Sequence, residues 1–171
     1  MNKKSEYIHL KHPWGPIWDK NSKILILGSF PSPKSRETGF YYGHPKNIFW
    51  KLLSDVFDAP PINDDIVSKV SFLLKHHIAL WDTIAECDIV GASDASIKNA
   101  VPNDVKTLVN SSNIATIFTT GRVSTNLYEN LCYDSVGIHA IYLPSTSPAN
   151  RALQKRTEFR STWEKLKEHT K

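Results

Sequence analysis

Two loops of the chain hold most of the side chains that could do chemistry, and the first follows Gly28. It runs from Ser29 to Lys46 as SFPSPKSRETGFYYGHPK, and Asn47 comes directly after it. The loop places flat aromatic rings beside a histidine and three cations, which suits stacking on nucleobases while phosphates are held alongside. An irregular stretch of about 18 residues is uncommon in a compact domain unless it is functional. The alternative is a rigid surface loop packed by its own aromatic rings.

The second loop follows Leu143 and reads PSTSPAN, from Pro144 to Asn150. It places three hydroxyl groups and backbone N–H groups at the start of an expected helix. Helix N-termini bind phosphate through such N–H groups and through the helix dipole. Simple capping of the helix is the alternative, because Ser, Thr and Pro are common at this position.

The elements that must position both loops follow from the apolar pattern. Unbroken apolar runs predict buried strands at residues 23–28, 78–82, 114–119 and 138–143. Apolar residues at helical spacing predict helices over residues 48–57, 64–76, 103–110, 121–131 and from about 150 to 168. Asn47 is expected to cap the first of these helices, and residues 91–103 are expected to form a loop.

Strands that alternate with helices indicate an α/β fold, a three-layer α/β/α sandwich around a central four-stranded parallel sheet. No linker or composition shift divides the chain, so we expect one domain over residues 1–171. Ligands of such sheets bind outside the carboxyl ends of the strands. This rule selects both loops, together with the turns after Asp82 and at Gly121.

The composition excludes several classes of protein. With 40% hydrophobic and 22% charged residues over 171 positions, the chain is too apolar for a disordered protein. No run approaches the ~18–20 apolar residues of a membrane helix. The basic N-terminus lacks the apolar stretch of a secretory signal. Cys87 and Cys132 are too few for a disulfide framework or a metal cage, so we expect a cytoplasmic protein without a metal.

The net charge of +4 is unevenly distributed along the chain. Residues 1–50 carry 8 Lys and Arg against 3 Asp and Glu, residues 51–150 carry 6 against 11, and residues 151–171 carry 7 against 3. This pattern suggests that the two basic ends meet a polyanion at the carboxyl edge of the sheet, while the acidic middle forms helices and the far face. A solvated basic face of the last helix is the alternative.

Five motifs together resemble a known family. They are GSFPS from Gly28, YYGHPKNIFW from Tyr41, ALWD from Ala79, SIKNAVPND from Ser96 and LPSTSPAN from Leu143. In this order they resemble the hypoxanthine-DNA (deoxyinosine) glycosylases, the sixth family of the uracil-DNA glycosylase superfamily, over about residues 10–165. The resemblance implies a monofunctional glycosylase, active as a monomer on DNA without a cofactor. Such an enzyme flips a deaminated base out of the helix and hydrolyses its N-glycosidic bond.

The resemblance assigns catalysis to Asn47, which matches the asparagine of the family's His-Pro-x-Asn stretch. There it would position water and bond the departing base. His44 would donate to a purine nitrogen, and its alternative is a brace within the loop. Other superfamily members place an Asp or Asn just after the first strand, whereas this chain has no carboxylate between Gly28 and Arg36. That difference agrees with a family that is weak or inactive on uracil.

The base pocket implied by the resemblance consists of Gly28, Ser29, Phe30, Pro31, Tyr42 and Asp82. Phe30 and Tyr42 would stack on the flipped base, and the backbone of Ser29 would lie near its polar edge. Asp82 would accept the N1–H of hypoxanthine, a donor that adenine lacks. The alternative for Asp82 is the N-cap of a helix that starts at Thr83.

The DNA backbone would be held by Ser145, Thr146, Ser147, Asn150, Arg151 and Arg122. The serines match the motif with which relatives pinch the DNA backbone, and the two arginines are candidate phosphate contacts. Pro148, Ala149 and Asn150 leave open which residue fills the gap left by the base. Two alternatives to hypoxanthine excision stay open: the same scaffold acting on uracil or xanthine, and a non-catalytic domain that binds nucleic acid.

Overall fold

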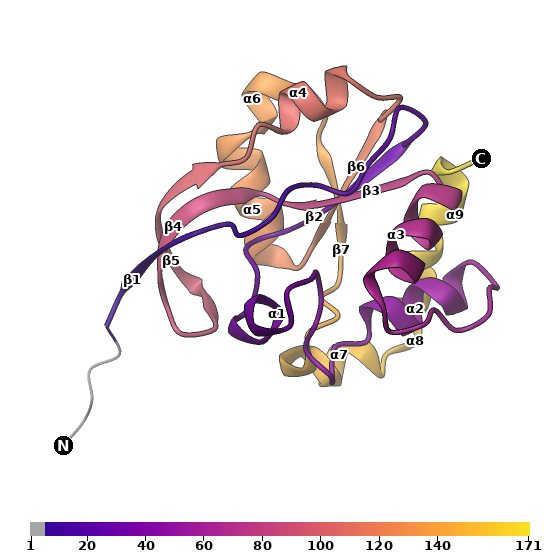
Figure 1. Cartoon of the computed structure of the whole chain (residues 1–171), viewed down its shortest axis with the longest axis horizontal. Coiled ribbons are helices and arrows are strands. Elements are labelled where there is room, and N and C mark those ends of the chain that lie inside the picture. The colour runs from indigo at the N-terminus through magenta and orange to yellow at the C-terminus, as the bar shows by residue number, and fades with distance from the viewer. Residues whose placement is uncertain (1–5) are drawn as a thin grey trace.

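Four parallel strands form the central sheet of the computed structural model, which describes residues 6–171 (Figure 1). In spatial order they are β3 (Ile78–Asp82), β2 (Ile24–Gly28), β6 (Thr116–Thr120) and β7 (Ala140–Leu143). Every residue of β2 is buried, as its unbroken apolar run predicts. The predicted four-stranded parallel sheet is therefore confirmed.

Helices cover both faces of this sheet. Alternate residues of β2 point to opposite sides, so Ile24 and Ile26 belong to one core cluster while Leu25 and Leu27 belong to another. The first cluster is covered by α2 (Phe49–Val56), α3 (Ile66–Lys75), α8 (Thr157–Glu164) and α9 (Leu166–His169). The second is covered by α4 (Val105–Asn110), α5 (Arg122–Leu131) and α6 (Tyr133–Val136). These layers are the predicted α/β/α sandwich.

A second, antiparallel sheet lies beside the sandwich and was not predicted. Its order is β1 (Ile8–Lys11), β4 (Ile84–Val90) and β5 (Ser93–Pro102). The expectation of a loop over residues 91–103 is wrong, because β5 pairs with β4 along its length despite several register shifts. Half of the residues of β5 are polar and none is fully buried, so the strand lacks the regular alternation of polar and apolar residues that reveals a strand in a sequence.

The long first loop contains a helix, α1 (Pro33–Thr38), so the expectation of an irregular stretch is wrong. Ser32 caps α1 by accepting a hydrogen bond from the backbone N–H of Ser35 at 3.1 Å. Pro33 starts the helix, and Gly39 ends it with a φ of 82°. Ser32, Pro33 and Gly39 are residue types that favour helix ends, but a helix of six residues is too short to show helical periodicity in the sequence.

The last helix is also shorter than expected. Residues 148–169 form a 3₁₀ turn (Pro148–Asn150), α7 (Arg151–Gln154), α8 and α9. Arg156 breaks the run with an extended backbone, at φ −77° and ψ 146°. The apolar spacing hides this break, because Phe159, Trp163 and Leu166 still share one buried face beyond it. No helix within residues 6–171 is long and apolar enough to cross a membrane.

Candidate active site

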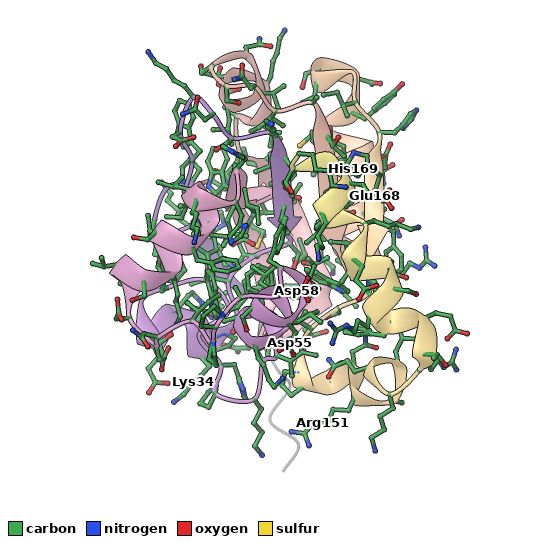
Figure 2. All side chains as sticks on the ribbon, turned by 90° about the vertical axis from the view of Figure 1, so that its right-hand side faces the viewer. Lys34, Asp55, Asp58, Arg151, Glu168 and His169 are labelled. Atoms are coloured by element: carbon green, nitrogen blue, oxygen red, sulfur yellow. The ribbon has the colours of Figure 1, made fainter. Side chains whose placement is uncertain are left out.

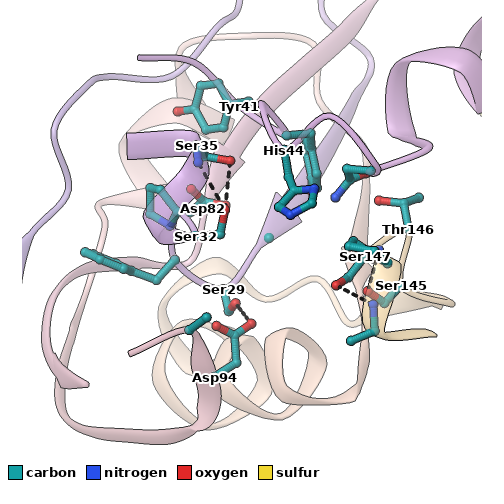
Figure 3. A pocket seen from close by; sticks show the side chains of 18 residues that line it. Ser29, Ser32, Ser35, Tyr41, His44, Asp82, Asp94, Ser145, Thr146 and Ser147 are labelled. Carbon is teal, nitrogen blue, oxygen red and sulfur yellow. Dashed lines mark hydrogen bonds between the residues drawn. The ribbon is translucent and has the colours of Figure 1, made fainter. Parts of the chain in front are cut away.

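A cavity of about 340 Å³ opens at the carboxyl edge of the parallel sheet, within the ~300–1,000 Å³ range of small-molecule sites. Four chain segments form it: the end of β2 with the loop that follows, the end of β3, the β4–β5 turn, and the loop after β7. Eleven predicted site residues line it: Gly28, Ser29, Phe30, Pro31, Tyr42, His44, Asn47, Asp82, Ser145, Thr146 and Ser147. Figure 3 shows Asp82 and Ser145–Ser147 on opposite sides, with His44 between them.

Asp82 ends β3 and is 5% exposed on the cavity wall. A side chain at Gly28 is impossible, because its Cβ would collide with Oδ1 of Asp82 and lie 3.3 Å from the hydroxyl of Tyr42. The alternative reading of Asp82 as a helix cap is wrong, since Thr83 leads directly into strand β4. The carboxylate is thus free to serve the cavity.

His12 holds this carboxylate from behind and was not predicted. Its Nε2 donates to Oδ2 of Asp82 at 2.8 Å, and both side chains are almost fully buried. The other ring nitrogen, Nδ1, faces the backbone N–H of Trp14 at 3.4 Å, which places the proton on Nε2. The ring also packs edge-on against Phe30 at 5.9 Å between centroids. Nothing in the sequence links residues 12 and 82, so only the tertiary fold reveals the pair.

The two predicted stacking residues lie on the cavity wall. Tyr42 stacks on Phe49 with ring centroids 3.8 Å apart and an interplanar angle of 11°. Its backbone has a φ of 52°, an uncommon conformation for a bulky residue. Burial, followed by the nearby charge of Asp82, raises the pKa of Tyr42, so its hydroxyl stays protonated and bonded to Thr120 Oγ1 at 3.1 Å. Phe30 is 6% exposed, so it is a fixed wall and not a mobile ring.

The two predicted catalytic residues both present hydrogen-bond donors. Ile48, not Asn47 as expected, is the N-cap residue of α2, but Oδ1 of Asn47 accepts the backbone N–H of Phe49, the first residue of the helix, at 3.0 Å. This bond leaves the side-chain NH₂ for a ligand. Nδ1 of His44 accepts the backbone N–H of Lys46 at 3.0 Å, so Nε2 carries the proton. His44 can therefore brace the loop through Nδ1 and donate to a ligand through Nε2, so the two alternatives for this residue are compatible.

The loop after β7 is rigid. Asn150 donates from Nδ2 to the carbonyl of Ser145 at 2.9 Å, and Gln154 donates to the carbonyls of Ser145 and Ser147 at 3.2 and 2.8 Å. Ser147 caps the short 3₁₀ turn, as the capping alternative expects. Thr146 differs: its hydroxyl is buried, lines the cavity and has no hydrogen-bond partner among the described residues. It is one of six buried side-chain polar atoms without a partner in the described part of the chain.

Three predicted DNA contacts lie outside the cavity. The side-chain amide of Asn150 donates to the carbonyl of Ser145 within the loop. Arg151 begins α7 and is exposed. The guanidinium carbon of Arg122 lies 4.0 Å from the ring centroid of Tyr142. The predicted charge map holds in part. Lys34 and Arg151 lie at the same end of the molecule (Figure 2), but Lys167 pairs with Asp58 further up.

Asp94 is a cavity residue that the sequence did not reveal. It comes from β5 and accepts a short hydrogen bond from the hydroxyl of Ser29. Burial raises the pKa of Asp94, and the charge of Asp82 raises it further, against the opposing effect of Ser29. The charge pattern predicts that the acidic middle of the chain forms helices and the far face. In the structure this part of the chain also supplies two carboxylates to the cavity, Asp82 and Asp94. No group of three or more candidate metal ligands occurs in the described part of the chain.

A parallel α/β sandwich with a polar and aromatic cavity at its carboxyl edge belongs to the class of open α/β folds that bind ligands outside the carboxyl ends of their strands. The family model of the uracil DNA glycosylase superfamily matches residues 16–167. A hypoxanthine DNA glycosylase of Methanosarcina acetivorans is 34% identical over 94% of this chain and 99% of its own length. One from Methanosarcina barkeri is 32% identical over 82% of this chain and 89% of its own.

The fold comparison agrees. The solution NMR structure of a proposed uracil DNA glycosylase from Methanosarcina acetivorans superposes with a TM-score of 0.79 and 30% identity, over 95% of this chain and 99% of that one. The chain belongs to the uracil DNA glycosylase superfamily.

Proposed function

We propose that the chain is a monofunctional DNA glycosylase that removes hypoxanthine from deoxyinosine in DNA, with water as the nucleophile. The observation that carries the proposal is the cavity itself, which the Asp82 acceptor lines together with the donors of Asn47 and His44 and the aromatic rings of Phe30 and Tyr42. The relatives named as hypoxanthine DNA glycosylases support the choice of base.

Asp82 is the proposed reader of the base. Hypoxanthine carries a donor at N1–H, where adenine carries only an acceptor, so a carboxylate accepts from the deaminated base and repels the normal one. The bond from His12 to Oδ2 fixes the carboxylate and leaves Oδ1, next to Gly28, for the base. The hydrogen-bonded pair of Asp94 and Ser29 lines the same cavity and adds a second polar contact for the base edge.

Asn47 and His44 are the proposed catalytic groups. In the reaction the bond between C1′ of the sugar and N9 of the base breaks, and its electron pair leaves with the base. Water then adds to C1′, and its proton ends on the base. The side-chain NH₂ of Asn47 and Nε2–H of His44 can donate to the departing base or hold the attacking water. Neither group has to become charged for this role.

The loop from Ser145 to Ser147 is the proposed clamp on the DNA backbone. Its carbonyls are held by Asn150 and Gln154, so its hydroxyls are preorganised for a phosphate. In this proposal Asn150 acts by supporting the loop, and Arg151 contacts DNA from the exposed start of α7.

The proposed substrate bears on how the chain works in the cell. A chromosomal substrate requires it to act at the nucleoid, in the cytoplasm of a prokaryote. We expect residues 1–171 to work as one domain and as a monomer. Sedimentation at working concentration with and without a DNA duplex tests this expectation.

Duplexes that contain inosine, uracil or xanthine test the function when abasic sites are revealed with alkali. We expect cleavage at inosine and a loss of about 100-fold or more in Asn47→Ala, in line with the worth of a positioned donor. Asn110→Ala changes an exposed asparagine at the far end of the sheet and serves as the matched control. Cleavage of uracil or xanthine alone would redirect the assignment to that base. Binding without any cleavage would contradict catalysis.

A further inference from the structure

We infer that a second, basic cleft binds the phosphodiester backbone of the same DNA, beside the nucleotide that is excised. This inference rests on the proposed function. The basic cleft has a volume of about 750 Å³ and lies between the end of β7 and the turn from α7 to α8. Four cations line it: Arg122, Lys155, Arg156 and Lys165.

The charge of the basic cleft is not compensated. None of its four cations forms an ion pair with a carboxylate within residues 6–171, and Glu158 is the one acidic residue among its described lining residues. Cations on the helices next to the cleft, α8 and α9, behave differently, since Arg160 pairs with Glu164 and Lys167 with Asp58. Four exposed cations without partners create the local positive potential that attracts a polyanion.

Arg122 is the best-positioned of the four. Its guanidinium carbon lies 4.0 Å from the ring centroid of Tyr142, so the aromatic face fixes the planar group. Stacking leaves the N–H edge of a guanidinium free, and this edge matches the oxygens of a phosphate in a bidentate manner. Arg122, one of the two arginines predicted as phosphate contacts, therefore lines the basic cleft and not the cavity.

The basic cleft and the cavity share one wall. Pro144 lines the cleft, and the next residue, Ser145, lines the cavity. Gln154 bonds to the carbonyls of the serine loop, while its neighbours Leu153 and Lys155 line the cleft. A DNA strand held by the serine loop thus has the basic cleft directly beside it, which is the position of the phosphates that flank the excised nucleotide. A continuous polyanion fits this arrangement better than an isolated small anion.

The salt dependence of DNA binding tests the inference. We expect Lys155→Gln/Arg156→Gln to bind an undamaged duplex with a smaller slope of log Kd against log salt, by about 0.9 for each lost phosphate contact. Lys75→Gln/Lys106→Gln removes the same charge from exposed positions on α3 and α4, and we expect it to keep the wild-type slope.

The outcomes separate the inference from the function. An unchanged slope in Lys155→Gln/Arg156→Gln would overturn the assignment of the basic cleft even if inosine is cleaved normally. A reduced slope would support the cleft even if inosine proved to be the wrong base, because the probe is undamaged DNA. A further arm adds inorganic phosphate at constant ionic strength. Displacement of the duplex by millimolar phosphate from the wild type but not from Lys155→Gln/Arg156→Gln would show a small-anion site. This result would contradict binding of the phosphodiester backbone in the basic cleft.

Discussion

The imidazole of His12 and the carboxylate of Asp82 meet at 2.8 Å behind the cavity, across 70 positions of sequence. Both groups are almost fully buried, and His12 also supports Phe30 from the edge of its ring. A buried carboxylate is costly unless its lone pairs find donors. The hydrogen bond from His12 therefore offsets the cost of burying the carboxylate of Asp82, which we propose reads the base.

Removal of His12 should destabilise the protein through Asp82. We expect His12→Ala to lower the free energy of unfolding by about 3 kcal/mol, the usual loss when one partner of a buried pair is removed. The double variant with Asp82→Ala should lose clearly less than the sum of both single losses. Urea denaturation measures all three variants, with His9→Ala as an exposed control that also contacts a carboxylate. Strictly additive losses would contradict the coupling.

Asp82→Asn should change which base is removed. The amide still fills the space but presents a donor as well as an acceptor, so it no longer discriminates strongly for N1–H. We expect cleavage of inosine to fall by roughly 5- to 160-fold, the value of about 1–3 kcal/mol for one base-reading contact, while its ratio to adenine cleavage also falls. Parallel single-turnover assays on both substrates measure this, with the exposed Asp134→Asn as control. An unchanged ratio would remove Asp82 from base reading.

Asp94 should make stability depend on pH. Burial raises the pKa of Asp94 above its ordinary value of 3.8, so the native state keeps this proton at pH values where the unfolded chain has lost it. The stability that this protonation provides is full below 3.8 and is lost as pH rises through the raised native pKa. We therefore expect Asp94→Asn to be more stable than wild type at neutral pH and equal to it in acid.

Chemical denaturation at several pH values checks this expectation. Asn can still accept the hydrogen bond from Ser29, so the variant removes the charge and keeps the contact. Asp134→Asn at an exposed site is the control and should follow the wild-type curve. A constant difference between Asp94→Asn and wild type at all pH values would show that the charge is not the cause.

The role of Asn47 as a donor can be separated from its hydrogen bond to the start of α2. Asp at this position would still accept the N–H of Phe49, but it would lack the NH₂ group. We expect Asn47→Asp to retain the wild-type unfolding free energy and to lose inosine cleavage about as severely as Asn47→Ala, roughly 100-fold. Activity near the wild-type level in Asn47→Asp would mean that the side-chain oxygen, and not the NH₂, is the catalytic group.

Replacement of Thr146 by Val should not lower the stability of the protein but should weaken its binding to DNA. Its buried hydroxyl has no partner in the described protein, so Val in its place keeps the shape and removes a polar group that gains nothing in the free state. We expect Thr146→Val to unfold at equal or higher urea concentration and to bind DNA more weakly. Ser54→Ala is the contrasting control, because that buried hydroxyl donates to the carbonyl of Lys51. Unchanged DNA binding in Thr146→Val would leave the hydroxyl without a function.

The sequence predicts the site best where a buried strand leads into it. Gly28 and Asp82 end two unbroken apolar runs, so their meeting at one sheet edge follows from the parallel arrangement alone. Asp94 and His12 could not be predicted in this way. Asp94 lies on a strand without buried residues, half of it polar, whose pairing is set by the tertiary fold. His12 reaches Asp82 only through the folded N-terminal segment. The missed residues are those that support or supplement the predicted ones.

The central claim is that the chain releases free hypoxanthine by hydrolysis. Chromatography of the products from an inosine duplex measures this most directly. We expect one free hypoxanthine for each abasic site, an intact strand until alkali is added, and formation of both products about 100-fold more slowly in Asn47→Ala. An inosine duplex that stays intact under saturating wild-type protein, or a strand that breaks without alkali, would contradict it.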